Sequence, residues 1–162
     1  MVSINQVAIN ASPLIVLFKS NQADLLPQLF DEIVVPQAVW QEVTSSGTQD
    51  TAAQQLPHVT WVKQVEVTIA PSVAAWDLGA GESSVLSFVL ENPAYRAMVD
   101  DRAARRCAKA LSINTLGTGG AIVLAKRRGL ITSAAEGLKK LQDAGLWLST
   151  DLINLLKQQA GE

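Results

Sequence analysis

The stretch VAINASPLIVLFK, residues 7–19, joins a short apolar strand pattern to the start of a helix. Residues 7–9 are apolar and lead into Asn10, and Ser12 and Pro13 then precede five further apolar residues. Ser followed by Pro and an apolar run predicts a helix with Ser12 as its N-cap and Pro13 at its first position. Asn10 is therefore expected at the tip of a strand, where α/β sheets bind their ligands.

Short apolar runs and helical patterns alternate along most of the chain. Strands are predicted at residues 7–9, 33–35, 60–62, 97–99 and 113–116. Helices are predicted at residues 14–19 and 23–30, 37–43, 81–90, 102–111 and 120–127. This alternation predicts an α/β fold with a central parallel, doubly wound sheet. The strands lack a polar–apolar alternation, which indicates that helices cover both faces of the sheet.

The end of the chain departs from the alternating pattern. Residues 134–144 and 150–159 predict two consecutive helices, with Ser149 or Thr150 capping the second. We therefore expect one domain over residues 1–162, with an α/β core at 1–129 and a C-terminal helical pair at 130–162. The last helix has a broad apolar stripe, which indicates either packing onto the core or a homodimer face.

Composition excludes several classes of protein. The 48% hydrophobic and 17% charged residues indicate a globular chain, and no apolar run approaches the roughly 20 residues of a membrane span. A single cysteine, Cys107, excludes an internal disulfide framework and favours a cytoplasmic location. The single histidine, His58, disfavours both a serine or cysteine triad and a structural zinc site.

Acidic residues recur where the predicted strands and helices meet. Glu42 lies on the predicted helix after Pro36, Glu82 in the first turn of a later helix, and Asp100 and Asp101 directly after a strand. Taken singly, Glu42 could be a solvated helix residue, and Asp101 could simply favour a helix N-terminus.

The strand ends of a parallel sheet share one edge, and several carboxylates there repel one another unless a cation neutralises them. Oxygen ligands without His or Cys select Mg²⁺ or Mn²⁺. The sequence therefore predicts a Mg²⁺ or Mn²⁺ site formed by Asn10, Glu42, Glu82 and Asp101, with Asp100 as a further candidate ligand.

Basic residues concentrate in one part of the chain. Seven of the thirteen Lys and Arg residues lie between Arg102 and Arg128, a window without Asp or Glu. Four of them recur on one helix face, at Arg102, Arg105, Arg106 and Lys109. Because this helix starts directly after Asp101, we expect the stripe to bind a phosphate backbone beside the acidic residues. The alternative is a solvated charged face.

The glycine-rich segment LGTGG, residues 116–120, lies between a predicted strand and a predicted helix. It lacks the Gly-Lys-Ser/Thr ending of a phosphate-binding loop, so a mononucleotide site is disfavoured. A tight turn is the simpler interpretation. Because the helix N-terminus faces the same edge, Thr118 is a candidate phosphate contact.

Five segments in this order resemble the PIN-domain family, in the branch that has a C-terminal helical pair. They are INASPLI (9–15), VPQAVWQEV (35–43), GAGE (79–82), VDDRAAR (99–105) and AKRRGLI (125–131). The resemblance spans nearly the whole chain and implies a three-layer α/β/α sandwich. It also implies a metal-dependent endoribonuclease acting on single-stranded RNA. Many PIN domains are toxins that a small antitoxin protein neutralises, so a small antitoxin-like partner is expected.

The resemblance also assigns site residues. The four acidic ligand positions of the family fall on Asn10, Glu42, Glu82 and Asp101, of which the three carboxylates would be catalytic. Ser12 matches a small hydroxyl residue that often lines the same site. Asn10 departs from the family pattern, because an amide oxygen can coordinate a cation but brings no charge.

Two alternatives follow from these residues. With Asn10 at the first ligand position, the chain could be a catalytically weak PIN fold that binds RNA or a protein partner. The pair Asp100 and Asp101 also suggests a phosphoacceptor receiver domain. Receivers place such a pair after the first strand, however, and here it follows the fourth.

Overall fold

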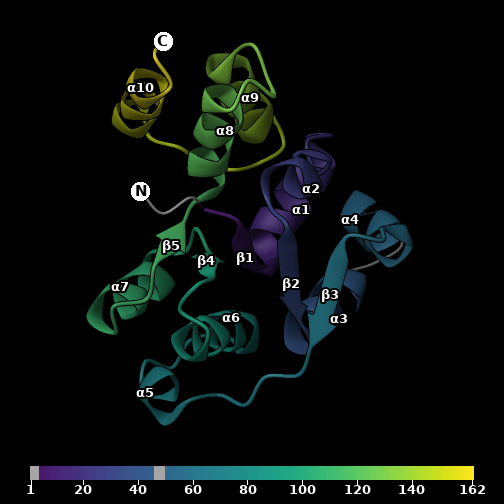
Figure 1. The fold of residues 1–162 in the computed structure, drawn as a ribbon, viewed down its shortest axis with the longest axis vertical. Helices are drawn as coiled ribbons and strands as arrows, with labels where there is room; N and C mark the ends of the chain where they lie inside the picture. Colours follow the sequence, from purple (N-terminus) through teal and green to yellow (C-terminus); the bar gives the residue numbers. More distant parts are fainter. Residues whose placement is uncertain (1–3, 46–49) are drawn as a thin grey trace.

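A five-stranded parallel sheet forms the centre of the computed structural model, which describes residues 4–45 and 50–162 (Figure 1). Its strands lie in the order β3-β2-β1-β4-β5. They are β1 (Gln6–Ile9), β2 (Glu32–Pro36), β3 (Val62–Val65), β4 (Arg96–Met98) and β5 (Thr115–Leu116). The order reverses direction between β1 and β4, so the expected doubly wound topology is confirmed.

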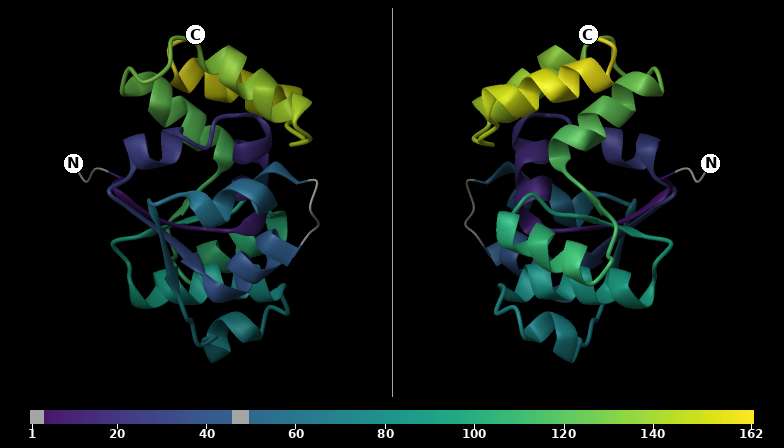
Figure 2. Two further views of the ribbon diagram at one scale, coloured as in Figure 1. Left: turned by 90° about the vertical axis from the view of Figure 1, so that its right-hand side faces the viewer. Right: turned by 90° about the vertical axis from the view of Figure 1, so that its left-hand side faces the viewer.

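Helices cover both faces of this sheet. One side holds α6 (Ala80–Glu91) and α7 (Arg102–Ala110), and the other holds α1 (Ala11–Lys19), α2 (Leu25–Leu29) and α8 (Thr118–Arg127) (Figure 2). The central strands are accordingly apolar after their first residue, and Val7, Ala8 and Ile9 are fully buried. The three-layer α/β/α sandwich is therefore confirmed. Within the described part of the chain, every helix is too short or too polar to cross a bilayer.

The C-terminal helical pair packs onto α8. It consists of α9 (Ala134–Asp143) and α10 (Thr150–Gln159), as the sequence predicts, and Ser149 caps α10 by accepting a hydrogen bond from the Leu152 amide at 3.1 Å. Close packing depends on a small residue in α8, because a Cβ on Gly119 would lie only 2.7 Å from Leu156 Cδ1. The division of the chain at residue 129 stays a prediction.

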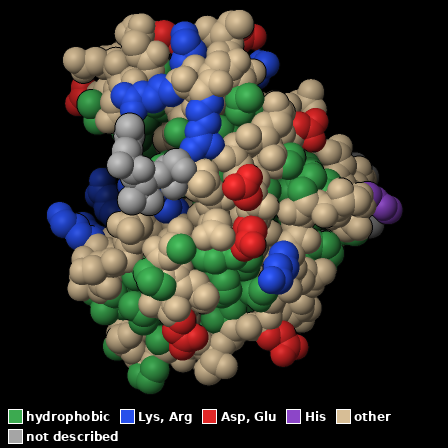
Figure 3. Space-filling model, viewed as in Figure 1, with side chains coloured by type: hydrophobic (Ala, Val, Ile, Leu, Met, Phe, Trp, Pro, Cys, Tyr) green, Lys and Arg blue, Asp and Glu red, His purple; other side chains and the backbone are tan. Residues whose placement is uncertain are grey.

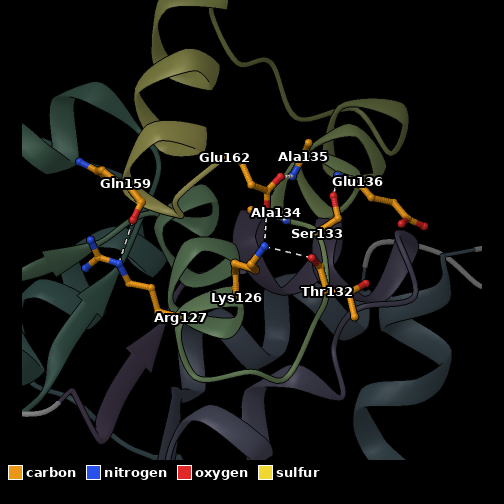
Figure 4. Close-up of polar contacts among 9 residues, drawn as sticks. All are labelled: Lys126, Arg127, Thr132, Ser133, Ala134, Ala135, Glu136, Gln159 and Glu162. Carbon is orange, nitrogen blue, oxygen red and sulfur yellow. Dashed lines mark hydrogen bonds and ion pairs between the residues drawn. The ribbon is translucent and has the colours of Figure 1, made fainter.

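Glu162, which follows α10, binds the start of α9 through hydrogen bonds (Figure 4). Its carboxylate accepts hydrogen bonds from the Ala134 amide at 2.5 Å, the Ala135 amide at 3.0 Å and Lys126 Nζ at 3.1 Å. These bonds lower the pKa of Glu162 to about 2. Lys126 also donates to the Thr132 carbonyl at 3.0 Å, so it belongs to the same junction.

The two arginines that follow Lys126 are also used within the fold. Arg127 Nε donates to the Gln159 carbonyl at 2.9 Å, as Figure 4 shows. Arg128 donates to the carbonyls of Leu29 at 2.6 Å and Ile4 at 2.8 Å. The basic end of α8 therefore holds the C-terminal helix and the N-terminal segment in place.

Several local expectations differ from the structure. The N-cap of α1 is Asn10 rather than Ser12, because the helix starts directly after β1 and includes Ala11. The strand expected at residues 60–62 lies at Val62–Val65, and the one expected at 113–116 is limited to Thr115–Leu116. Both are edge strands, where pairing on one side alone decides the ends.

Helices account for further differences. The structure adds α5 (Pro71–Ala74) and the 3-10 turn η1 (Leu56–His58), which were not expected. The segment 47–55 was expected as a loop or weak helix, and its second half forms α4 (Thr51–Gln55). Residues 46–49 lie outside the described residues. The helix α3 (Gln37–Ser45) extends two residues beyond its expected end.

Candidate functional site

Three of the predicted site residues, Asn10, Glu42 and Glu82, lie at the carboxyl edge of the sheet. Asn10 follows β1. Its backbone N–H donates a hydrogen bond to the Met98 carbonyl at the end of β4, at 3.1 Å, which links the ends of the two strands. The helix α6 leads into β4 and runs back along the sheet, so its first turn, with Glu82, lies at this edge. Glu42 reaches the same edge from the second turn of α3, which follows β2 without a loop.

Asn10 presents an unused acceptor. Its side chain is only 4% exposed, and Oδ1 is buried without a hydrogen-bond partner among the described residues. An N-cap side chain ordinarily accepts a bond from the second or third helical residue. Here the third residue is Pro13, which has no N–H, and Asn10 makes no side-chain cap bond. A buried acceptor left unpaired costs about 1–3 kcal/mol, which favours a ligand at this oxygen.

Gly81 marks the space that Asn10 shares with Glu42. A Cβ on Gly81 would lie 3.0 Å from Asn10 Oδ1 and 3.3 Å from Glu42 Oε1. Both oxygens therefore approach the same side of Gly81, and a residue without a side chain leaves room for them. This sets two oxygen donors from separate elements, β1 and α3, beside the first turn of α6.

The charge of Glu82 acts on Glu42. Partial burial raises the pKa of Glu42 above its ordinary 4.5, and the nearby Glu82 carboxylate raises it further. Both effects disfavour the ionised form, and a bound cation would reverse the second. Glu82 thus acts on Glu42 electrostatically, and Glu42 lies beside Asn10 at Gly81; we refer to these three residues as the edge cluster.

The donor set of this cluster consists of two carboxylates and an unpartnered amide oxygen. These are hard oxygen ligands of the kind that Mg²⁺ and Mn²⁺ prefer, so the residues fit a divalent cation. Among the described residues, no group of three His, Cys, Asp or Glu side chains lies close enough to hold a metal. A cation at this edge would therefore have at most two carboxylate ligands among the described residues, with the Asn10 oxygen as a further donor.

A basic groove lies beside this edge, between α7 and the start of α10. Its volume is about 1040 Å³. The right-hand panel of Figure 2 shows α7 below α10 on this side of the molecule, and Figure 3 shows Lys and Arg side chains in the upper left part of the surface. The cations that line the groove are Arg96, Arg102, Arg105, Arg106 and Lys109.

Among the residues that the structure describes, the groove cations form no ion pair with Asp or Glu. Within residues 4–45 and 50–162, the ion pairs that form involve other Lys residues, at the end of α8 and on α9. Arg105 donates to the Val99 carbonyl at 3.2 Å, and Arg96 to the Thr115 carbonyl at 3.4 Å. These bonds orient the two guanidinium groups without neutralising them, so the groove keeps its positive charge.

A protein-family model matches nearly the whole chain. The model of the family DUF3368, described as a PIN domain, matches residues 6–162. The chain belongs to the PIN-domain family. No curated protein and no solved structure matches it in the corresponding searches. PIN domains are generally nucleases and typically use divalent metal ions, which agrees with the oxygen donors at the carboxyl edge.

The two adjacent aspartates of this PIN domain have different hydrogen-bond partners. Asp101 is the N-cap of α7, and its Oδ2 accepts from the Ala104 amide at 2.9 Å. Asp100 accepts from the Thr118 amide at 2.8 Å through Oδ1 and from Thr118 Oγ1 at 2.5 Å through Oδ2. Asp100 therefore joins the end of β4 to the start of α8. Metal ligation by Asp100 and Asp101 stays a prediction.

The two hydroxyl residues predicted to contact substrate differ in exposure. Ser12 is exposed in the first turn of α1, two residues from Asn10. Thr118 is fully buried, and both of its donors bind Asp100. The structure therefore does not present Thr118 to a phosphate, because the glycine turn directs it toward β4.

Arg96 and Trp147 line the groove, although neither was predicted from the sequence as a site residue. Arg96 begins β4, and Trp147 lies between α9 and α10. Neither belongs to the helix periodicity that revealed Arg102, Arg105 and Arg106. No sequence signal indicated Trp147, because it lies between two leucines in a short connection and far along the chain from the other groove residues.

The apolar stripe of α10 is only partly covered. Leu156 is buried, whereas Leu152 is 40% and Leu155 49% exposed. A second groove of about 460 Å³ runs between these leucines and Gly119 and Gly120 of α8. Packing onto the core thus accounts for part of the stripe, and the homodimer face stays a prediction.

Proposed function

We propose that this PIN domain is an endoribonuclease that depends on Mg²⁺ or Mn²⁺. The observation that carries the proposal is the buried, unpartnered Oδ1 of Asn10, which approaches the same space as Glu42 Oε1. A bound cation would explain why this oxygen has no hydrogen-bond donor in the folded protein, because the cation would be its partner.

Asn10, Glu42 and Glu82 would hold the cation, and Asp101 would lie at the rim with one carboxylate oxygen free of the Ala104 amide. When bound, Mg²⁺ or Mn²⁺ supplies activation of water and neutralisation of phosphate charge. In the reaction, water adds to phosphorus and one P–O ester bond breaks, which gives two shorter strands. Ser12 is exposed at the start of α1, where it could contact the substrate.

The basic groove supports RNA as the substrate. Arg102 begins α7 directly after Asp101, so the groove starts at the carboxyl edge that holds the acidic residues. Phosphates bound by Arg105, Arg106 and Lys109 would place a strand so that it leads toward that edge. Unpaired cations in a groove attract a polyanion and release its counterions.

The second candidate is an RNA-binding module with little catalytic power. The observation that favours it is the neutral Asn10 together with the finding that no three acidic side chains converge among the described residues. This candidate keeps the basic groove and its RNA, but it removes the metal-dependent chemistry.

Cleavage of a labelled single-stranded RNA separates the two candidates. We expect cleavage with Mg²⁺ or Mn²⁺ and none with EDTA, and we expect Glu82→Gln to lower the rate by about 10²–10³-fold. The control is Glu91→Gln, which makes the same change at the other end of α6. Metal-independent RNA binding without cleavage would establish the second candidate instead.

The family resemblance adds a toxin role, a small antitoxin-like partner and a cytoplasmic location. Co-expression with the adjacent reading frame tests this. The expected result is a small protein that co-purifies with the PIN domain and suppresses cleavage. A neighbour that neither binds nor suppresses would contradict the toxin role and leave the nuclease proposal intact.

A further inference from the structure

Trp147 is the most exposed of the large apolar side chains in the described part of the chain, at 82%. It lies in the connection between α9 and α10, where Leu146 and Leu148 on either side pack against the core. The connection therefore alternates inward and outward side chains, and Trp147 is the one that faces outward.

The connection is fixed at both ends. The Leu146 amide donates to the Leu141 carbonyl at 3.0 Å, and Ser149 caps α10. Gly145 has a φ of +110°, a conformation that side-chain-bearing residues rarely adopt, so it makes the turn that leads into the connection. The backbone of this connection is thus held in place while the Trp147 indole is exposed to solvent.

Trp147 lines the basic groove together with the cations of α7. The groove has one acidic lining residue, Asp100, and both of its carboxylate oxygens accept hydrogen bonds from Thr118. An aromatic ring beside unpaired cations is the combination that binds single-stranded nucleic acid, because the cations follow the phosphates and the ring stacks on a base.

We infer that Trp147 stacks on a base of the RNA strand whose phosphates lie along the groove. Charge complementarity identifies the occupant as a polyanion, and the aromatic ring requires a base free of its own stack. The strand is therefore single at this point. This inference rests on the proposed function, since it takes the bound RNA to be the substrate.

Binding of a fluorescein-labelled ten-uridine RNA, measured by anisotropy in EDTA, tests the inference. EDTA removes divalent metal, so binding is measured without cleavage. We expect Trp147→Ala to weaken binding by about 5- to 150-fold, and we expect Trp147→Phe to restore most of it because phenylalanine also stacks. The wild type should also bind the single strand more tightly than the same RNA in a duplex.

Trp76→Ala is the matched control, since Trp76 is 40% exposed and does not line the groove. It should leave the affinity unchanged, and the melting temperature of each variant reports folding. Equal affinity of wild type and Trp147→Ala overturns the inference, as does a Phe variant no better than Ala. Loss of a dimer in Trp147→Ala with unchanged RNA affinity would assign Trp147 to a protein interface and also overturn it.

The two proposals fail separately. If Trp147→Ala weakens binding but the wild type cleaves no RNA with Mn²⁺, the nuclease proposal fails and stacking stands. If the wild type cleaves RNA and Trp147→Ala binds it equally well, stacking fails and the nuclease proposal stands. A wild type that binds no RNA overturns the stacking inference.

Discussion

The side-chain oxygens of Asn10 and Glu42 approach the same side of Gly81, at 3.0 Å and 3.3 Å from the position of a Cβ on that residue. Asn10 comes from the end of β1 and Glu42 from α3, so the fold assembles this pair from distant parts of the sequence. The absence of a side chain at Gly81 makes their approach possible. This relationship leads to the first two predictions.

Gly81→Ala should weaken Mn²⁺ binding. The added methyl group would press on both oxygens and force them apart. It should also stabilise α6 slightly, because alanine favours helices by about 1 kcal/mol over glycine, which offsets the crowding. Calorimetric titration with Mn²⁺ checks affinity. The control is Gly120→Ala in the first turn of α8, where a Cβ would meet the Leu116 side chain and neither of these oxygens. Equal Mn²⁺ affinity in the Gly81 variant and the wild type would contradict this geometry.

Asn10→Asp should tighten Mn²⁺ binding and lower the melting temperature without metal. A carboxylate at this buried position would repel Glu42 and Glu82 until a cation neutralises them. As residues of the turn between strand and helix, Asp and Asn are nearly interchangeable, so a purely structural role predicts no change in Mn²⁺ binding. Melting curves with and without Mn²⁺ measure both effects. Unchanged curves in both conditions would make Asn10 a turn residue and not a ligand.

Arg106→Ala should weaken binding of single-stranded RNA and flatten its dependence on salt. Each phosphate contact contributes about 0.7 to the slope of log affinity against log salt for a single strand, so loss of one contact lowers the slope by about that amount. Lys139→Ala is the control, because Lys139 lies on α9 and pairs with Asp143. An unaltered slope in the Arg106 variant would indicate a solvated charged face.

Acid should loosen the junction between α9 and α10. The folded-state pKa of Glu162, about 2, lies below its ordinary 4.5, so its carboxylate stabilises the fold above pH 4.5. That contribution is lost as the pH falls from 4.5 toward 2. Glu162→Gln should therefore lower the melting temperature at pH 7. At pH 3, the difference in melting temperature between this variant and the wild type should be smaller. A difference that is constant between these pH values would contradict the role of the charge.

Local patterns predicted the central elements well. The buried strands β1 and β2 and the helix α10 with its Ser149 cap follow from apolar runs and capping residues that act over a few positions. The predicted bounds of the edge strands β3 and β5 differ from the structure by two or three residues, because their ends depend on pairing with a neighbour. The four-residue helix α5 has no periodicity long enough to predict.

The candidate site was predicted in part. The rule that parallel strands end at one edge of the sheet predicted that Asn10, Glu42 and Glu82 lie close together. The oxygens beside Gly81 and the raised pKa of Glu42 support this prediction. The sequence could not show that the Thr118 side chain turns inward to Asp100. Nor could it find Trp147, since its place in the groove depends on how α9 and α10 pack on α8.

Calorimetric titration of the wild type, Glu42→Gln and Glu91→Gln with Mn²⁺ tests the central claim most directly. The claim is that Asn10, Glu42 and Glu82 hold one divalent cation. We predict binding of one Mn²⁺ by the wild type and by Glu91→Gln, and a large loss of affinity in Glu42→Gln. Failure of the wild type to bind Mn²⁺, or equal affinity in all three proteins, would contradict the claim.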